Sequence, residues 1–142
     1  MPTASSEHEY PVLIVERHLD TFGHVNNATY LELFEEARWD LIVANGYGIE
    51  KIRETRKGPT ILEVRLEFKR ELLNRQRIVI RTRIESYSGK VGTLVQVMQN
   101  DAGDLFCVGT FLIGLFDLDA RKLILPTSEW RKAVGLELSE RP

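Results

Sequence analysis

The residues best suited to chemistry lie in one polar loop, residues 17–27, which contains Asp20 and ends in Asn26 and Asn27. A segment with helical periodicity follows, and the first N–H groups of a helix have no partner within it and carry a partial positive charge. Those donors could stabilise the oxyanion of an attacked carbonyl, while Asp20 acts as nucleophile or as general base on water. Gly23 allows the sharp turn between them. The loop therefore suggests an acyl-transfer site, although Asp20 and Asn27 could also serve only as caps of loop and helix.

Two other chemistries of this loop have less support. His18, Asp20 and His24 are suitable metal ligands, but an irregular loop does not force them to converge and no further ligand is evident. Cys107 could pair with His24 as a thiolate nucleophile, but it lies in the apolar run 105–108, where cysteine is usually inert core. We expect no metal, no cofactor and no cysteine nucleophile.

A long helix is predicted directly after the loop, over residues 28–44. Apolar side chains recur on one face at helical spacing: Tyr30, Leu33, Phe34, Ala37, Leu41 and Ala44. Further apolar residues widen this face, so we expect the helix to be covered on most sides. The two asparagines are favoured N-cap residues, and Gly46 and Gly48 are expected to end the helix.

The remainder of the chain has the period of β-structure. Strands are predicted at residues 10–15, 62–68, 78–84, 91–99 and 105–116. A charged link is expected at 51–57, a hairpin turn at 100–104 and a further turn at 117–122. Gly109 and Gly114 suggest a bulge or a close backbone approach. A short helix is predicted at 129–134, capped by Thr127 or Ser128.

Composition restricts the function further. The chain has 142 residues, 43% hydrophobic, and 19 Lys and Arg against 21 Asp and Glu, for a formal charge of −2. This suits a single domain, residues 1–142, with residues 1–9 flexible, and argues against a general nucleic-acid surface. A single cysteine excludes an intrachain disulfide. No apolar run is long enough to span a membrane and no secretory signal opens the chain, so we expect an intracellular, cytoplasmic protein.

The order of elements predicts an α+β fold, in which antiparallel strands with short turns form a sheet and one long helix is segregated from them. One helix on one curved sheet leaves much apolar surface uncovered. A second subunit is the simplest way to bury that surface.

Residues 17–39 resemble the signature of the hotdog-fold thioesterases, through the pattern D-x-x-G-H-V-N-N-x-x-Y followed by E-x-A-R. They are most similar to the 4-hydroxybenzoyl-CoA thioesterase-like branch, which includes bacterial long-chain acyl-CoA thioesterases. The resemblance implies an antiparallel sheet wrapped around one long central helix, a homodimer or homotetramer, and an active site at the dimer interface. It also implies that Asp20 is the catalytic carboxylate and that the Asn27 N–H polarises the carbonyl.

The expected activity is hydrolysis of acyl-CoA to a free acid and CoA. An acyl-ACP thioesterase, or a non-catalytic acyl-thioester binding protein of the same fold, is the alternative. Gly23, His24, Tyr30 and Phe34 are candidates for substrate contact, although a core role explains Tyr30 and Phe34 equally well. His24 is expected mainly to hold the loop through a hydrogen bond to its backbone.

The phosphates of CoA require cationic partners, and Lys90 and Arg121 (or Lys122), in turns near strand ends, are the candidates. Arg38 falls on the apolar side of the predicted helix. A buried guanidinium needs a partner, so we expect Arg38 to bind a carboxylate or backbone carbonyls.

Overall fold

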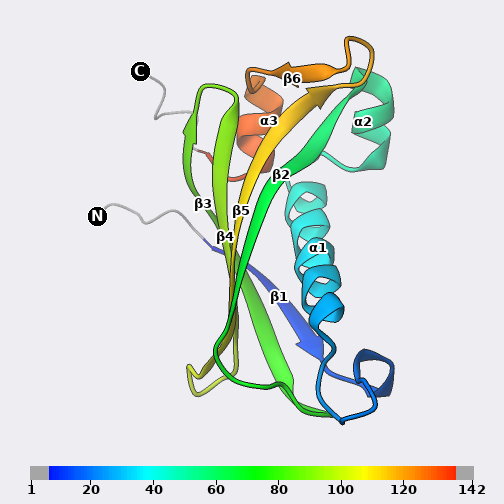
Figure 1. Ribbon diagram of the computed structural model, residues 1–142. Helices are drawn as coiled ribbons and strands as arrows, with labels where there is room; N and C mark the ends of the chain where they lie inside the picture. Colours follow the sequence, from blue (N-terminus) through cyan, green and yellow to red (C-terminus); the bar gives the residue numbers. More distant parts are fainter. Residues whose placement is uncertain (1–6, 137–142) are drawn as a thin grey trace, which may run out of the picture.

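The structure, a computed structural model, describes residues 7–136 and consists of one sheet with helices on one side of it (Figure 1). The strands are β1 (His8–Leu13), β2 (Lys57–Phe68), β3 (Arg77–Ser88), β4 (Val91–Gln99), β5 (Leu105–Asp117) and β6 (Lys122–Ile124). The helices are α1 (Asn27–Ala44), α2 (Ile49–Thr55) and α3 (Ser128–Ala133), with a short 3-10 helix at Glu16–His18.

All strand pairs are antiparallel, and the sheet order is β1-β3-β4-β5-β2, with β6 added beside the end of β5. The long helix α1 lies along one face of this sheet (Figure 1). The arrangement confirms the α+β class and the hotdog fold, in which a curved antiparallel sheet wraps around a central helix.

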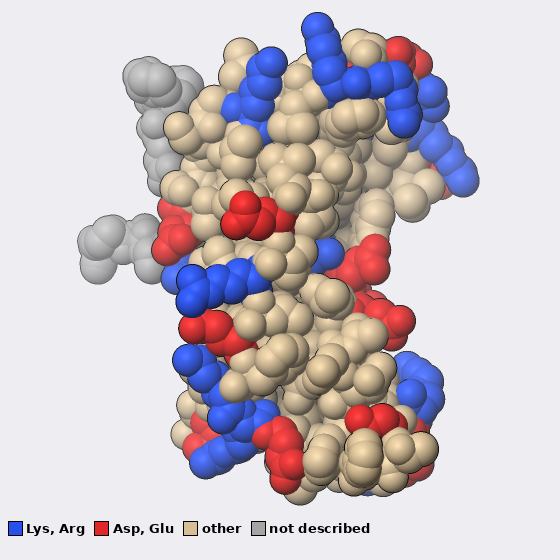
Figure 2. Space-filling view, in the orientation of Figure 1, with Lys and Arg blue, Asp and Glu red and all other residues tan. Residues whose placement is uncertain are grey.

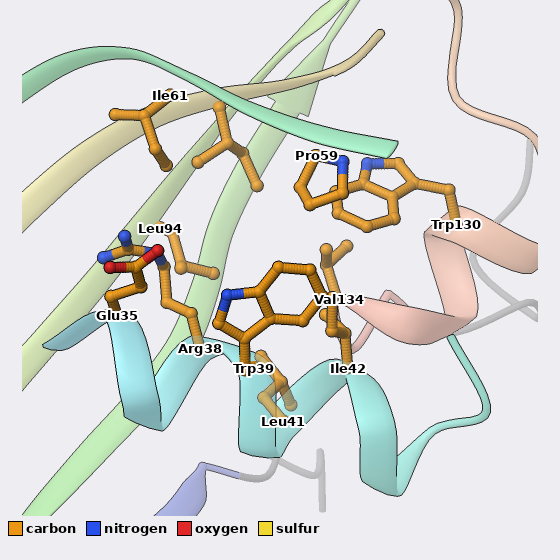
Figure 3. Close-up of a pocket in the computed structure, with 11 residues that line it drawn as sticks. Glu35, Arg38, Trp39, Leu41, Ile42, Pro59, Ile61, Leu94, Trp130 and Val134 are labelled. Carbon is orange, nitrogen blue, oxygen red and sulfur yellow. The ribbon is translucent and has the colours of Figure 1, made fainter. Parts of the chain in front are cut away.

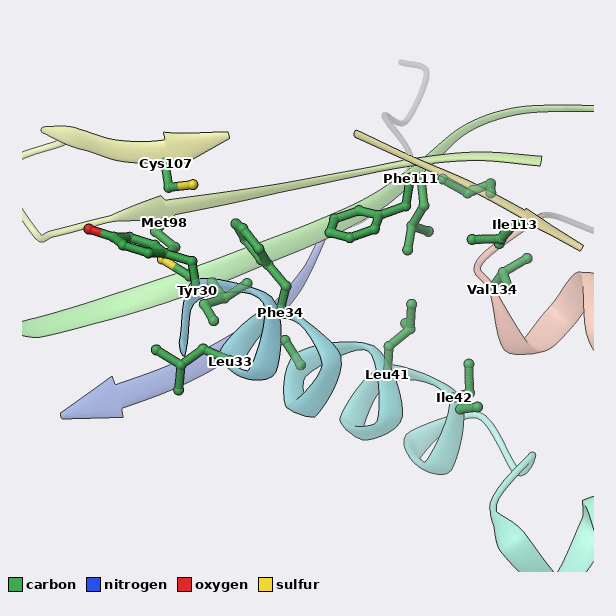
Figure 4. Packing of buried hydrophobic residues seen from close by; sticks show 14 of the residues in the cluster. Tyr30, Leu33, Phe34, Leu41, Ile42, Met98, Cys107, Phe111, Ile113 and Val134 are labelled. Atoms are coloured by element: carbon green, nitrogen blue, oxygen red, sulfur yellow. The ribbon is translucent and has the colours of Figure 1, made fainter. Parts of the chain in front are cut away.

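The core forms where the apolar face of α1 meets β3, β4 and β5 (Figure 4). Phe34 is fully buried and its ring packs edge-on against Phe111, with 5.7 Å between centroids. Met98 and Cys107 are equally inaccessible in the neighbouring strands. The alternation predicted for residues 78–84 is confirmed, because Ile78, Ile80, Thr82 and Ile84 are all buried.

Three parts of the sequence prediction need correction. The expected charged link contains α2, whose seven residues place Ile52 against the core and the charged side chains outside. The expected turn at 117–122 leads into β6, which has only three residues and therefore little pattern of its own. Residues 8 and 9, expected to be flexible, pair with Thr82 and Arg81 in the sheet; residues 1–6 lie outside the described part.

The coverage of α1 and β2 is also less complete than expected. Leu31 and Val43 on α1 are 39% and 56% exposed. On β2, an edge strand, side chains of both faces are exposed: Ile61, Leu62, Val64 and Phe68. Half-burial fails because, within the described chain, no strand pairs with the outer edge of β2.

The surface view agrees with the small net charge. Lys and Arg side chains are interspersed with Asp and Glu over the face shown in Figure 2. None of the helices within residues 7–136 has both the length and the hydropathy needed to cross a membrane.

Candidate active site

The loop before α1 forms a small hairpin. The Asp20 N–H donates to the His24 carbonyl (2.9 Å), and the Asn26 N–H donates to the His18 carbonyl (3.3 Å). Leu19 and Val25 form a bridge between these two hydrogen bonds. Gly23 has φ +88°, a left-handed conformation that glycine adopts without a steric penalty, and so closes the turn.

The hairpin is held against the segment between β2 and β3. The Val25 N–H donates to the Leu72 carbonyl (3.2 Å), and His24 forms a bridge with Leu73. In the same segment, Arg75 donates two hydrogen bonds to the Glu16 carboxylate, at 2.7 and 2.9 Å. These bonds and one from Asn74 lower the pKa of Glu16 to about 2. The loop that carries Asp20 is thus fixed by a segment about fifty residues later in the chain.

The Asp20 carboxylate lies at the surface of this hairpin. Its Oδ1 accepts a hydrogen bond from the Phe22 N–H (2.9 Å), which fixes the orientation of the side chain. The Phe22 side chain beside it is 81% exposed. Asp20 is therefore open to a ligand or to a second subunit, and it is not drawn into the core.

The amino end of α1 lies at the base of the same hairpin. Asn26 is the N-cap residue, but its side chain makes no capping hydrogen bond, so the expected role of an asparagine side chain as cap is wrong there. Among the hydrogen bonds within residues 7–136, none has the Asn27 N–H as donor. Asp20 is two residues beyond the His18–Asn26 pair, about 7 Å along the hairpin, and Asn27 directly follows that pair.

A solvent-open hollow of about 280 Å³ lies beside Asn27, and Asp20 is not among the residues that line it. It brings together three predicted residues, His24, Asn27 and Tyr30, with Gly23 adjacent in the chain. Tyr30 packs edge-on against Phe68 (5.1 Å between centroids), and burial raises the pKa of its hydroxyl. The other residues that line the hollow are Val25, Phe68, Lys69, Arg70 and Glu71.

The partner of His24 differs from the expected one. Its Nε2 lies 3.1 Å from Oε1 of Glu71, so the ring contacts a carboxylate of the β2–β3 segment and not the loop backbone. In place of the expected Lys90 and Arg121, the cations that line the hollow are Lys69 and Arg70. Their only signal was their place directly after a predicted strand, and nothing in the sequence shows that this strand ends beside α1.

Three of the predicted contact residues lie elsewhere. Phe34 has no exposed surface. Lys90 and Arg121 are in the β3–β4 and β5–β6 turns, at the opposite end of the protomer from the first turn of α1 (Figure 1). A single protomer therefore does not bring these two cations to the hollow.

The two alternative chemistries gain no support from the geometry. The His18 ring is buried and its Nδ1 accepts from the Val15 N–H (2.9 Å), and burial lowers the pKa of this histidine. No group of three potential metal ligands is found within residues 7–136. Cys107 is fully buried, and burial raises the pKa of its thiol to about 12.

Arg38 lies along the same helix and has an unexpected partner. Its Nη1 donates to the side-chain amide oxygen of Gln96 (3.1 Å), and its Cζ lies 4.5 Å from the centre of the Phe111 ring. Gln96 in turn donates to the Phe34 carbonyl and to the Thr82 hydroxyl. The expected carboxylate or backbone carbonyl is thus replaced by a buried amide, and burial lowers the pKa of Arg38.

Comparison with known proteins assigns this chain to a family. The model of the thioesterase-like superfamily matches residues 15–135, which include the hairpin, α1 and the whole sheet after β1. The chain belongs to this superfamily. The resemblance to thioesterases that the loop sequence indicated is therefore confirmed, and the match extends over residues 15–135.

Individual relatives agree with this assignment. The long-chain acyl-CoA thioesterase FadM of Escherichia coli (strain K12) is 28% identical over 116 residues, 81% of this chain and 87% of that protein. The probable thioesterase YbaW from Escherichia coli has a similar structure, with a TM-score of 0.81 and 24% identity over 90% of this chain and 96% of that one. The Staphylococcus aureus protein SAV2348, solved in complex with CoA, has a TM-score of 0.86 and 12% identity over 100% and 93% of the two chains.

Proposed function

We propose that this thioesterase hydrolyses acyl-CoA by means of Asp20 and the first turn of α1. The observation that carries the proposal is the exposed Asp20 carboxylate on the hairpin that leads into α1, together with the Asn27 N–H, which donates to no group within residues 7–136. A carboxylate can act as base or nucleophile and an amide donor can stabilise the oxyanion, so this pair can hydrolyse a thioester without a metal or cofactor.

The reaction follows from this pair. Asp20 takes a proton from water as the water oxygen adds to the thioester carbonyl, and the Asn27 N–H stabilises the oxyanion. Collapse of the tetrahedral intermediate breaks the C–S bond, and the CoA sulfur leaves and receives a proton. Asp20 could instead attack the carbonyl itself, giving a mixed anhydride that water then cleaves. Both routes yield a free acid and CoA.

The substrate carrier proposed is CoA, and the acyl group a long chain. FadM is named for long-chain acyl-CoA, and SAV2348 binds CoA in its crystal structure. Lys69 and Arg70 line the hollow beside Asn27 and are the cations we propose for the CoA phosphates.

Lys90 and Arg121 could reach the phosphates from a second subunit. If two protomers join along β2 in antiparallel fashion, the end of one that carries these turns lies towards the first α1 turn of the other.

We propose a homodimer, or a homotetramer built from such dimers. The exposed apolar residues of β2 and the highly exposed Phe22 favour burial against a second copy, since monomers rarely leave an edge strand of this kind uncovered. The candidate site would then lie at the interface, with Asp20 and Asn27 from one protomer.

The proposal is tested by Asp20→Asn, which keeps the Oδ1 acceptor for the Phe22 N–H but removes the base. We expect kcat for palmitoyl-CoA to fall by about 100-fold or more, with unchanged circular dichroism and molecular mass. Asp101→Asn, in the exposed β4–β5 turn, is the matched control and should retain full activity. Full turnover in Asp20→Asn, or tight binding of palmitoyl-CoA by the wild type without release of CoA, would overturn the proposal.

A further inference from the structure

A second hollow, apart from the Asp20 region, lies between α1, β2 and α3 (Figure 3). It has a volume of about 120 Å³. Both tryptophans of the chain, Trp39 and Trp130, line it. Its other lining residues are Glu35, Arg38, Leu41, Ile42, Pro59, Ile61, Leu94, Ile113 and Val134. We call it the tryptophan cavity.

The wall of the tryptophan cavity is almost entirely hydrocarbon. Of its two charged residues, Arg38 is held against the sheet by Gln96 and the Phe111 ring, and Glu35 is exposed at the rim. In Figure 3 these two lie at the end nearer the start of α1, while Trp130 of α3 lies at the other end. Water gains little in such a space because it needs several polar partners, so an apolar ligand is the better occupant.

A row of apolar side chains on β2 connects this cavity with the hollow beside Asn27. Residues opposite each other in an antiparallel pair lie on the same face of a sheet. Phe68, Leu66 and Val64 are opposite Cys107, Gly109 and Phe111, the positions of β5 on the face covered by α1. Phe68 meets Tyr30 at one end of the row, and Val64 is 42% exposed in its middle.

A β-bulge keeps the row on one side along the whole strand. The register shifts between Ile61 and Glu63, so Leu62 is an extra residue on β2. On the amino-terminal side of the bulge, Ile61 is opposite the buried Ile113, and Pro59 is opposite Leu115. The helix-facing row therefore continues through Ile61 and Pro59 into the tryptophan cavity, while Leu62 faces away from it.

The length of this path selects the ligand. Twelve helical residues separate Asn27 from Trp39, which corresponds to about 18 Å. The hydrocarbon core of a bilayer is about 30 Å thick and contains two acyl chains end to end, so one lipid acyl chain spans about 15 Å. A chain of that length, with its thioester at Asn27, ends at the tryptophan cavity, and a short acyl group does not reach it.

We propose that the tryptophan cavity receives the methyl end of a long, unbranched acyl chain and sets the upper limit of chain length. This inference rests on the proposed thioesterase function and adds to it a site for the distal part of the substrate. Each methylene that moves from water into the cavity favours the long chain by a factor of about four.

The first test fills the cavity from β2. Ile61→Phe adds a ring to the helix-facing row, and Leu62→Phe, next to it on the other side of the strand, is the matched control. We expect the ratio of kcat/KM for palmitoyl-CoA to that for hexanoyl-CoA to fall at least about tenfold in Ile61→Phe, corresponding to two methylenes excluded, and to stay at the wild-type value in Leu62→Phe. An unchanged ratio in Ile61→Phe, or an equal change in both variants, would overturn the inference.

The second test reads the position of the chain end directly. Since both tryptophans line the cavity, quenching of the protein's tryptophan fluorescence reports on this site alone. A fatty acid with a nitroxide near its methyl end should quench more strongly than one with the nitroxide near its carboxyl group. Equal or absent quenching by the two probes would refute the cavity as the chain terminus.

The two proposals fail separately. A wild-type protein that hydrolyses no acyl-CoA but shows the end-selective quenching would contradict the proposed function and support the cavity as an acyl site. A protein that hydrolyses acyl-CoA with a length profile insensitive to Ile61→Phe would contradict only the cavity.

Discussion

Asp20 and Cys107 illustrate how position decides the reactivity of a side chain. Asp20 lies on a surface hairpin, oriented by the Phe22 N–H and open on its other side. Cys107 lies in β5 with no exposed surface, opposite Phe68. A thiol is nucleophilic only as the thiolate, so burial that favours the neutral form makes it inert.

We expect Cys107 to be unreactive in the folded protein. With a pKa of about 12 the thiol stays protonated from pH 7 to pH 9, whereas a free thiol with a pKa near 9 is half ionised at the upper end of that range. Iodoacetamide should therefore modify Cys107 at pH 8 only when urea is added, as measured by mass spectrometry. Cys107→Ala should keep the catalytic rate, and rapid modification of the native protein would contradict this description.

At this scale the sequence offers candidate residues for the site but does not indicate which distant residues contact them. Asp20 and Asn27 are seven residues apart, and the turn between them is predicted from Gly23. The contacts of His24 with Glu71, and of the hairpin with Leu72, come from a distant segment. No local pattern indicates which distant residues complete a loop, so Glu71, Lys69 and Arg70 could not be assigned.

At the scale of elements, α3 shows a helix whose first turn depends on one hydroxyl. The Thr127 side chain accepts a hydrogen bond from the Trp130 N–H (3.2 Å), while Ser128 is already within the helix. The same tryptophan is 1% exposed, and its ring N–H donates to the Tyr87 hydroxyl (3.0 Å). The structure thus decides between the two capping residues that the sequence left open.

We expect Thr127→Ala to lower the free energy of unfolding by about 1 kcal/mol, because one N–H of the first turn of α3 loses its acceptor. Ser128→Ala, one residue later, should change stability by less than about 0.5 kcal/mol. Urea denaturation followed by tryptophan fluorescence measures both. A larger loss in Ser128→Ala than in Thr127→Ala would show that the cap is assigned to the wrong residue.

The sequence predicts most elements because their patterns are long. Residues 28–44 and 91–99 match α1 and β4 to within one residue, and Gly114 confirms the close approach, since a Cβ there would lie 3.0 Å from the Lys90 carbonyl oxygen. The failures are elements too short for a period, α2 and β6, and the strand β2, whose bulge interrupts the alternation between Ile61 and Glu63.

At the scale of the whole molecule, the exposed outer edge of β2 predicts self-association. Val64→Lys places a charge on this edge strand, and inward-facing lysines prevent strand edges from pairing. We expect the wild type to be a dimer or larger by light scattering, and Val64→Lys to dissociate at micromolar concentration.

Val43→Lys is the matched control, since Val43 is an exposed valine on α1, 56% accessible, and away from this edge. It should keep the mass of the wild type. A monomeric wild type with full activity would exclude an interfacial site.

The sequence predicts the need for a second subunit from the mismatch between one helix and a wide sheet, but not where the second subunit binds. That position depends on which strand ends the sheet. The order β1-β3-β4-β5-β2 places an early strand, β2, at one edge beside a late one, β5, and strand order is not written in any local pattern.

The bulge on β2 has a consequence for how the gene can vary. Leu62 has no paired residue on β5. A chain shortened by this one codon would keep Ile61, Val64 and Leu66 turned inward, because strict alternation from Ile61 through Glu63 to Val64 is then restored. Deletion of Arg65 could also remove the bulge, but regular alternation from Ile61 would then turn Glu63 inward and Val64 outward. Two single-residue deletions three positions apart therefore have opposite outcomes.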